Sequence, residues 1–113
     1  MVRLGCMRWV TSYDVDADIL HYQEVDEAGW MQREVLKFGP AFTLMTATTK
    51  FERLRVRRTG RLADYSRTYG DVLAVLERPY VDPAVHVDIS GEDFETVWQS
   101  ARSRVAHRSV SAI

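Results

Sequence analysis

The residues best suited to acid–base chemistry in this chain are two histidines, each close to a second polar side chain. His86 and Asp88 alternate within residues 85–89, so a strand there would project both side chains from one face. His21 is followed directly by Tyr22 in another strand-forming segment. A general acid or base must lie within hydrogen-bond reach of its substrate. These four residues are therefore the candidates for a catalytic site, on the condition that the fold brings them together.

Other motifs of catalysis are missing from the sequence. It has no glycine-rich phosphate loop, no serine or cysteine nucleophile motif and no His-Glu-x-x-His pair. Its one cysteine, Cys6, allows neither an internal disulfide nor a cysteine-based metal site, and this usage is typical of the cytoplasm. We therefore expect no metal and no cofactor, and a non-catalytic protein is favoured over an enzyme.

Charge is segregated along the chain, although the net charge is only -1. Residues 9–32 contain six carboxylates and no lysine or arginine, whereas residues 50–67 contain seven basic residues and two acids. A surface divided in this way favours oriented docking on a charged partner. The nearly neutral total disfavours nucleic acid, whose binding depends on an overall basic field.

In the acidic part, Asp14, Asp16 and Asp18 alternate as the first ligands of a calcium loop do. The remaining positions do not fit, because Ile19 stands where such a loop needs glycine and Val25 where it needs a bidentate glutamate. The alternatives are a solvated acidic turn and a weak cation site. We keep the three aspartates as candidate binding residues and predict no formed metal site.

In the basic part, arginines alternate with apolar residues. Arg53, Arg55 and Arg57 are separated by Leu54 and Val56, a period of two that predicts a half-buried strand with one guanidinium face. A helix is the alternative, because arginine and leucine are good helix formers. The arginine face, extended by Arg58, could contact a protein or simply face solvent.

The aromatic residues offer two interpretations. Trp9, Trp30 and Trp98 can meet in the core between a sheet and the final helix, or they can line a pocket for a small hydrophobic ligand, with Tyr13 at its polar fringe.

The pattern of the elements predicts a single α+β domain over residues 1–113. Alternating or β-branched segments predict strands at residues 7–13, 19–25, 30–38, 41–49, 53–57 and 85–89, with a turn at 26–29 in which Gly29 supplies a positive φ. Ser90 is placed as the N-cap of an amphipathic C-terminal helix. We expect a curved antiparallel sheet of five or six strands packed against this helix. Residues 71–77 could form a short helix or a buried strand, and the helix is favoured.

The ends and edges of the domain give further expectations. Residues 1–6 would be a short leader if translation starts at Met7, and residues 109–113 would fray. No run approaches the roughly 20 apolar residues of a membrane span. A strand with one charged face could sit at a sheet edge and pair with a second copy, so a homodimer is compatible with the pattern.

Two stretches, within residues 7–38 and 85–101, resemble a family of small bacterial domains of unknown function that is common in actinobacteria. The resemblance rests on Met7-Arg8-Trp9-Val10, on residues 21–30 and 33–35 with Phe38, and on residues 87–98. Some members of that family look like immunity proteins, which implies a protein that docks on and neutralises another protein. Residues 41–83, which contain the arginines, depart from the family.

Two functions follow from these observations. The first is a small cytoplasmic, non-catalytic binding module of immunity type that docks on a protein partner through its charged faces. The second is a cofactor-independent enzyme or ligand-binding protein that holds a hydrophobic metabolite in the aromatic pocket.

Overall fold

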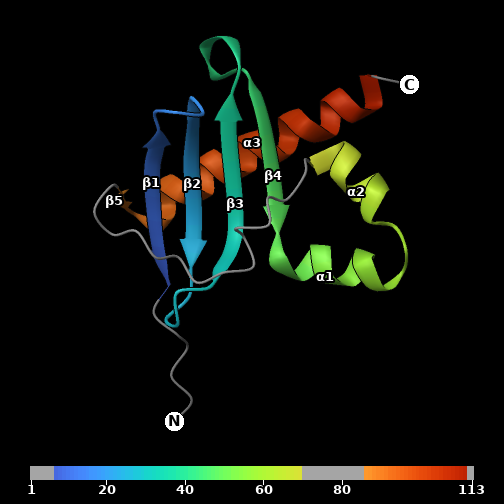
Figure 1. Cartoon of the computed structure of the whole chain (residues 1–113), viewed down its shortest axis with the longest axis horizontal. Coiled ribbons are helices and arrows are strands. Elements are labelled where there is room, and N and C mark those ends of the chain that lie inside the picture. The colour runs from blue at the N-terminus through green and yellow to red at the C-terminus, as the bar shows by residue number, and fades with distance from the viewer. Residues whose placement is uncertain (1–6, 70–85, 112–113) are drawn as a thin grey trace.

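The structure, a computed structural model, describes residues 7–69 and 86–111 (Figure 1). Its elements follow in the order β1 (Arg8–Asp14), β2 (Ile19–Val25), β3 (Met31–Phe38), the 3-10 turn η1 (Pro40–Phe42), β4 (Leu44–Thr49), α1 (Lys50–Arg58), α2 (Leu62–Tyr69), β5 (His86–Ile89) and α3 (Gly91–Ser111). The five strands form one antiparallel sheet in the order β4-β3-β2-β1-β5. The predicted α+β fold is confirmed. The predictions for residues 1–6 and 71–77 lie outside the described residues.

The first four strands form a meander whose turns follow from local chemistry. Between β2 and β3, the Asp26 carboxylate accepts hydrogen bonds from the backbone N–H groups of Ala28 and Trp30, both at 2.9 Å. Gly29 adopts a φ of 90°, as the sequence predicted for this turn. Strand β5 returns from a distant part of the chain and pairs with β1, Thr11 standing opposite Val87. Residues that are distant in sequence thus meet at the β1–β5 edge.

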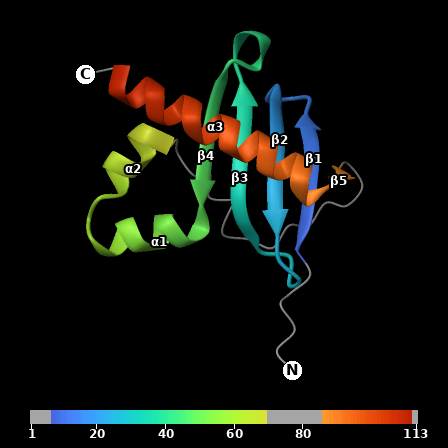
Figure 2. The ribbon, with the colours of Figure 1, turned by 180° about the vertical axis from the view of Figure 1, so that it is seen from behind.

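Helix α3 begins at the predicted cap and crosses one face of the sheet (Figure 2). The Ser90 hydroxyl accepts a hydrogen bond from the Asp93 N–H at 3.0 Å, which satisfies one of the free donors of the first turn. The helix packs its apolar side on β3 and β4, and the resulting core contains Val35, Met45, Ala47, Phe94, Trp98, Ala101 and Val105. The C-terminal amphipathic helix was therefore identified correctly from its cap and its period.

The two short helices lie beside the β4 edge of the sheet (Figure 1). Helix α1 continues directly from β4, and Thr49 serves as its N-cap by accepting a hydrogen bond from the Glu52 N–H at 2.9 Å. None of the helices within residues 7–69 and 86–111 has both the length and the apolarity needed to cross a membrane.

Candidate functional site

The arginine-rich segment is a helix, and the predicted strand over residues 53–57 is wrong. The cause is the sequence Thr49-Lys50-Phe51-Glu52, a helix-capping pattern that precedes a run of good helix formers. This pattern was the signal that could have identified the helix, because the alternation of arginine with Leu54 and Val56 fits either structure. The correction changes which side chains share a face, since a helix repeats every 3.6 residues rather than every two.

Helical geometry separates the arginines that a strand would have aligned. Arg53 is buried, with 6% of its surface exposed, and so it does not belong to an exposed guanidinium face. Arg55 and Arg58 are exposed and lie at helical spacing with Phe51 and Leu54. We call these four residues, Phe51, Leu54, Arg55 and Arg58, the α1 outer face.

The α1 outer face is unusual because it exposes large apolar side chains. Phe51 is 73% exposed and Leu54 is 44% exposed, although both belong to a regular helix in a domain with an ordinary core. Single exposed apolar residues are common on soluble proteins, but an aromatic and a leucine side by side among arginines are typical of a binding surface. Arg57 is also exposed and flanks this face.

The opposite side of α1 is anchored by a polar network that begins at Glu52. Its carboxylate accepts hydrogen bonds from both terminal nitrogens of Arg102 in α3 and, at 3.0 Å, from the hydroxyl of Tyr65 in α2. The Tyr65 oxygen in turn accepts from the Thr49 N–H at 2.9 Å, and Arg102 Nε donates to the Ala47 carbonyl at 3.1 Å. The network therefore joins α1, α2 and α3 to the end of β4.

The pKa values in this network follow from burial and pairing. Burial alone would raise the pKa of Glu52, but the hydrogen bonds and charge of Arg102 outweigh it and lower that pKa. Burial, with the Glu52 charge beside it, raises the pKa of Tyr65 to about 12. Glu52 is therefore ionised and Tyr65 neutral at pH 7, which is the state in which the network is complete.

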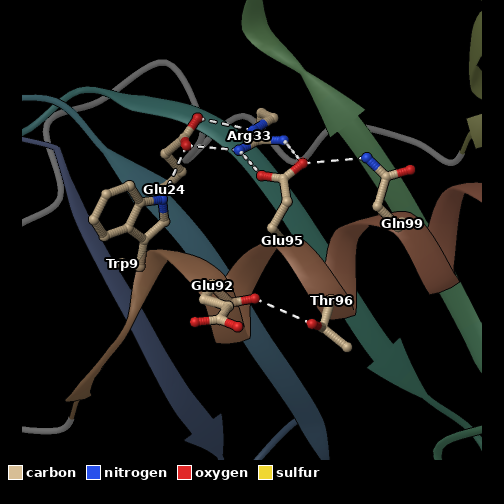
Figure 3. A network of polar contacts seen from close by, with 7 residues as sticks. All are labelled: Trp9, Glu24, Arg33, Glu92, Glu95, Thr96 and Gln99. Atoms are coloured by element: carbon tan, nitrogen blue, oxygen red, sulfur yellow. Dashed lines mark hydrogen bonds and ion pairs between the residues drawn. The ribbon is translucent and has the colours of Figure 1, made fainter.

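A second network fixes the start of α3 on the sheet and uses Glu24, one of the six carboxylates of residues 9–32 (Figure 3). Arg33 donates to Glu24 from Nε at 2.9 Å and from Nη2 at 2.7 Å, and it donates to Glu95 at 3.1 and 2.8 Å. Trp9 Nε1 donates to Glu24 at 2.9 Å, and Gln99 donates to Glu95 at 3.2 Å. The hydrogen bonds to Glu24 raise the pKa of Arg33, and those from Arg33 lower the pKa of Glu95.

This second network is structural in character. The Arg33 guanidinium also lies 5.0 Å from the ring centroids of both Phe94 and Trp98, so its charge is enclosed between carboxylates and aromatic rings. Both carboxylate oxygens of Glu24 are therefore hydrogen-bonded within the fold, so this side chain is not available to bind a partner.

The four catalytic candidates do not form one site. His21 and Tyr22 point to opposite faces of β2, and Tyr22 lies on the α3 side beneath the Lys37 ammonium at 5.4 Å. His86 and Asp88 do share a face, as predicted. Arg8 joins them, with Nη2 at 3.0 Å from both His86 Nε2 and Asp88 Oδ1. Among the described residues, this cluster is a sheet edge held by the Arg8–Asp88 ion pair.

On the sheet face turned away from α3, sequence reasoning missed two buried polar residues. Glu34 is 1% exposed and accepts a hydrogen bond from Gln23 Nε2 at 2.7 Å, while His21 Nδ1 lies 3.9 Å from the same carboxylate. Among the described residues, Gln23 Oε1 and Glu34 Oε1 have no hydrogen-bond partner. The alternation in β2 and β3 indicated which face these residues occupy, but not that this face is buried.

The three candidate aspartates shape their own turn. Asp14 accepts hydrogen bonds from the Asp16 and Ala17 N–H groups at 3.0 and 3.1 Å, and Asp18 accepts one from the Tyr13 hydroxyl. Over residues 7–69 and 86–111, no group of three or more His, Cys, Asp or Glu side chains is placed to hold a metal ion. The solvated acidic turn, one of the two alternatives, describes this arrangement.

The four aromatic candidates for a pocket lie in separate environments. Trp98 is in the core, stacked with Phe94 at a centroid distance of 6.4 Å, and Trp9 packs at the core's edge. Trp30 lies at the β2–β3 turn with the Lys50 ammonium 5.0 Å from its ring. Tyr13 is at the other end of the sheet, edge-on to Phe42 at 6.2 Å. The described part of the chain therefore does not bring these four rings together at one place.

Comparison with known proteins gives no relative on which to base a function. No family model matches the chain, and no curated protein or solved structure matches it either. The fold and its surfaces define a single-sheet α+β protein whose most distinctive exposed feature is the α1 outer face.

Proposed function

We propose that this protein is a small, non-catalytic binding module that docks on a protein partner through the α1 outer face. The observation that carries the proposal is the 73% exposure of Phe51 on a helix whose neighbouring positions are Leu54, Arg55 and Arg58. An immunity-type role in the cytoplasm, in which the module masks a partner's working surface, is the form of this function that the family resemblance suggests.

The apolar residues would supply most of the affinity. Removing a phenylalanine side chain from water contributes roughly 1.5 to 3 kcal/mol, and Leu54 adds to this because it lies one turn away on the same face. Helices that insert apolar residues at i and i+3 into a groove are a recurrent mode of protein recognition. The partner should therefore present an exposed apolar surface to this helix.

The arginines would set orientation and rate. Arg55 and Arg58 flank the apolar pair, and exposed Arg57 and Arg61 extend the positive field beyond them. Charges at the rim of an interface act mainly on the association rate and are screened by salt. The partner's apolar surface should therefore be bordered by carboxylates.

Because α1 is anchored to the rest of the domain, its outer face should lose little conformational entropy when it binds a partner. The Thr49 cap and the Glu52–Arg102–Tyr65 network hold the helix from behind, so its outer face is presented in a fixed orientation before the partner arrives. A rigid surface loses less conformational entropy on association than a flexible one.

Photo-crosslinking at Phe51 tests the proposal directly. A photoreactive phenylalanine analogue replaces Phe51 in the protein expressed in its source cells, and the same analogue replaces the exposed Ser100 of α3 as the matched control. We expect a discrete adduct with one protein partner from position 51 and none from position 100. Identical patterns from both positions, or no discrete adduct at position 51, would refute the docking role of α1.

Charge-reversal variants then measure the arginine contribution with the purified adduct partner. Arg55→Glu with Arg58→Glu should weaken binding at least about tenfold at low salt, mostly through a slower association rate. Arg104→Glu on α3 is the control, since Arg104 is exposed and outside the α1 outer face. Equal loss in both proteins would mean that net charge, rather than this surface, governs the association.

A further inference from the structure

A second exposed apolar surface lies on the α3 side of the sheet, at the end that the helix leaves uncovered (Figure 2). Tyr13 and Val87 belong to the same sheet face as Trp9, but they are 46% and 65% exposed, whereas Trp9 packs against the core. Leu20 stands opposite Tyr13 in the β1–β2 register, and Val15 in the adjoining turn is 75% exposed. We call this surface, formed by Tyr13, Val15, Leu20 and Val87, the sheet corner.

The sheet corner is bordered by negative charge. Asp18 accepts the hydrogen bond of the Tyr13 hydroxyl, and this bond, together with the charges of Asp18 and Asp14, raises the pKa of Tyr13. Asp16 is exposed at the tip of the same turn. The nearest basic residue in the register is Lys37, opposite Leu20, and its ammonium is directed over the Tyr22 ring.

The sheet corner and the α1 outer face match each other, because both expose apolar side chains and their charges are opposite. One combines apolar side chains with aspartates, and the other combines Phe51 and Leu54 with arginines. The two surfaces lie at opposite ends of the molecule, the corner at the β1–β2 turn and α1 beyond the far end of β4 (Figure 1). One chain therefore cannot bring its own two surfaces together.

We propose that the sheet corner binds the α1 outer face of a second copy of this chain. The inference rests on the proposed docking role of α1 and names a partner for it. Because the two contacting surfaces differ, the contact is head-to-tail, and the assembly keeps a free sheet corner on the chain at one end and a free α1 outer face on the chain at the other end. Association should therefore continue beyond the dimer as concentration rises.

Two variants test the contributions of the two surfaces separately. The helix variant carries Arg55→Glu and Arg58→Glu, and the corner variant carries Asp16→Lys and Val87→Lys, at positions whose side chains are exposed. A control carries Thr96→Lys and Arg104→Glu, exposed positions on α3. Circular dichroism establishes that each variant is folded before its association is compared.

Sedimentation equilibrium at low and high salt is the measurement. In wild type and control, the average mass should rise past that of a dimer at low salt, and high salt should reverse this. Each variant alone should be monomeric, with at least about a tenfold weaker association. A mixture of the two variants should form dimers and stop there, because only one intact pair of surfaces remains.

Three results would overturn the inference. These are a wild type that stays monomeric at low salt up to millimolar concentration, variants that associate as well as wild type, and a mixture that stays monomeric while wild type associates. A discrete crosslink from position 51 to a different protein, together with a monomeric wild type, would refute self-association and leave the docking role of α1 standing. If position 51 gives no discrete crosslink and the wild type also stays monomeric, both the docking role of α1 and the self-association are refuted.

Discussion

Replacing Arg33 with methionine should destabilise the domain strongly, because it removes the cation between two carboxylates and leaves an unbranched apolar side chain in its place. The Arg33 side chain is 22% exposed, Glu24 is 10% exposed and Glu95 is 45% exposed. After the substitution, the Trp9 N–H is the one remaining partner that the network provides for Glu24. The variant thus leaves a nearly buried carboxylate without its counter-charge.

The magnitude follows from the exposure of the two partners. Removing one member of a buried ion pair costs about 3 to 5 kcal/mol, and the exposed Glu95 can regain water, so we expect a loss of about 3 kcal/mol. An unfolding entropy of about 2.1 cal/mol/K per residue makes this roughly a 12 °C decrease in Tm for a chain of this size. Since small domains have about 5 to 15 kcal/mol of stability, the variant should still fold.

Urea denaturation followed by tryptophan fluorescence measures this loss. Arg67→Met is the matched control, because Arg67 and Asp64 form an ion pair with 76% and 67% of their side chains exposed, which should contribute less than about 1 kcal/mol. Adding Glu24→Gln to the Arg33 variant should restore about 1 to 2 kcal/mol by removing the unpaired charge. A loss in Arg33→Met no larger than in Arg67→Met would show that the network does not stabilise the fold.

Two further predictions concern the anchors of α1 and α3. Glu52→Gln should cost about 1 to 2 kcal/mol at pH 7, because it weakens the partly buried contact with Arg102. Because folding lowers the pKa of Glu52, the ionised carboxylate stabilises the folded state above the unfolded pKa of 4.5, and this stabilisation is lost as the pH falls below that value toward the folded-state pKa. The difference in unfolding free energy between wild type and Glu52→Gln should therefore be smaller at pH 3 than at pH 7. Gly91→Ala would place a Cβ 2.9 Å from Trp9 Cη2, so we expect a net loss of about 1 kcal/mol and a shifted tryptophan emission, despite the better helix propensity of alanine. Unchanged emission with increased stability would contradict the close packing of these two residues.

The elements whose patterns agree with their environment were predictable from the sequence. The strand-forming residues of 19–25 and 30–38, on either side of the turn at 26–29, identified β2 and β3, and the Ser90 cap with apolar residues at helical spacing identified α3. In α3 the period of the apolar residues matches the face that packs in the core, whereas β2 and β3 bury residues on both of their faces. Local propensity, cap and burial all favour the same structure there.

The arginine segment shows where the sequence was ambiguous. Its alternation fits a strand, and its composition and the Thr49 cap fit a helix. Part of the outcome depends on the network that Glu52 forms with Arg102, fifty residues later in the chain. A contact over that separation is not visible in any local pattern, so the strand prediction failed at the residues that we now consider functional.

Sequence alone thus determined the class of fold, the meander, the final helix and the segregation of charge, because each depends on short-range periodicity or composition. Tertiary structure decided how that charge is used. Glu24 and Glu52 are bound by Arg33 and Arg102 within the fold, and Arg53 is buried, while Arg55 and Arg58 remain exposed beside Phe51. Which charges face a partner depends on which are neutralised internally, and that is fixed only when distant segments pack together.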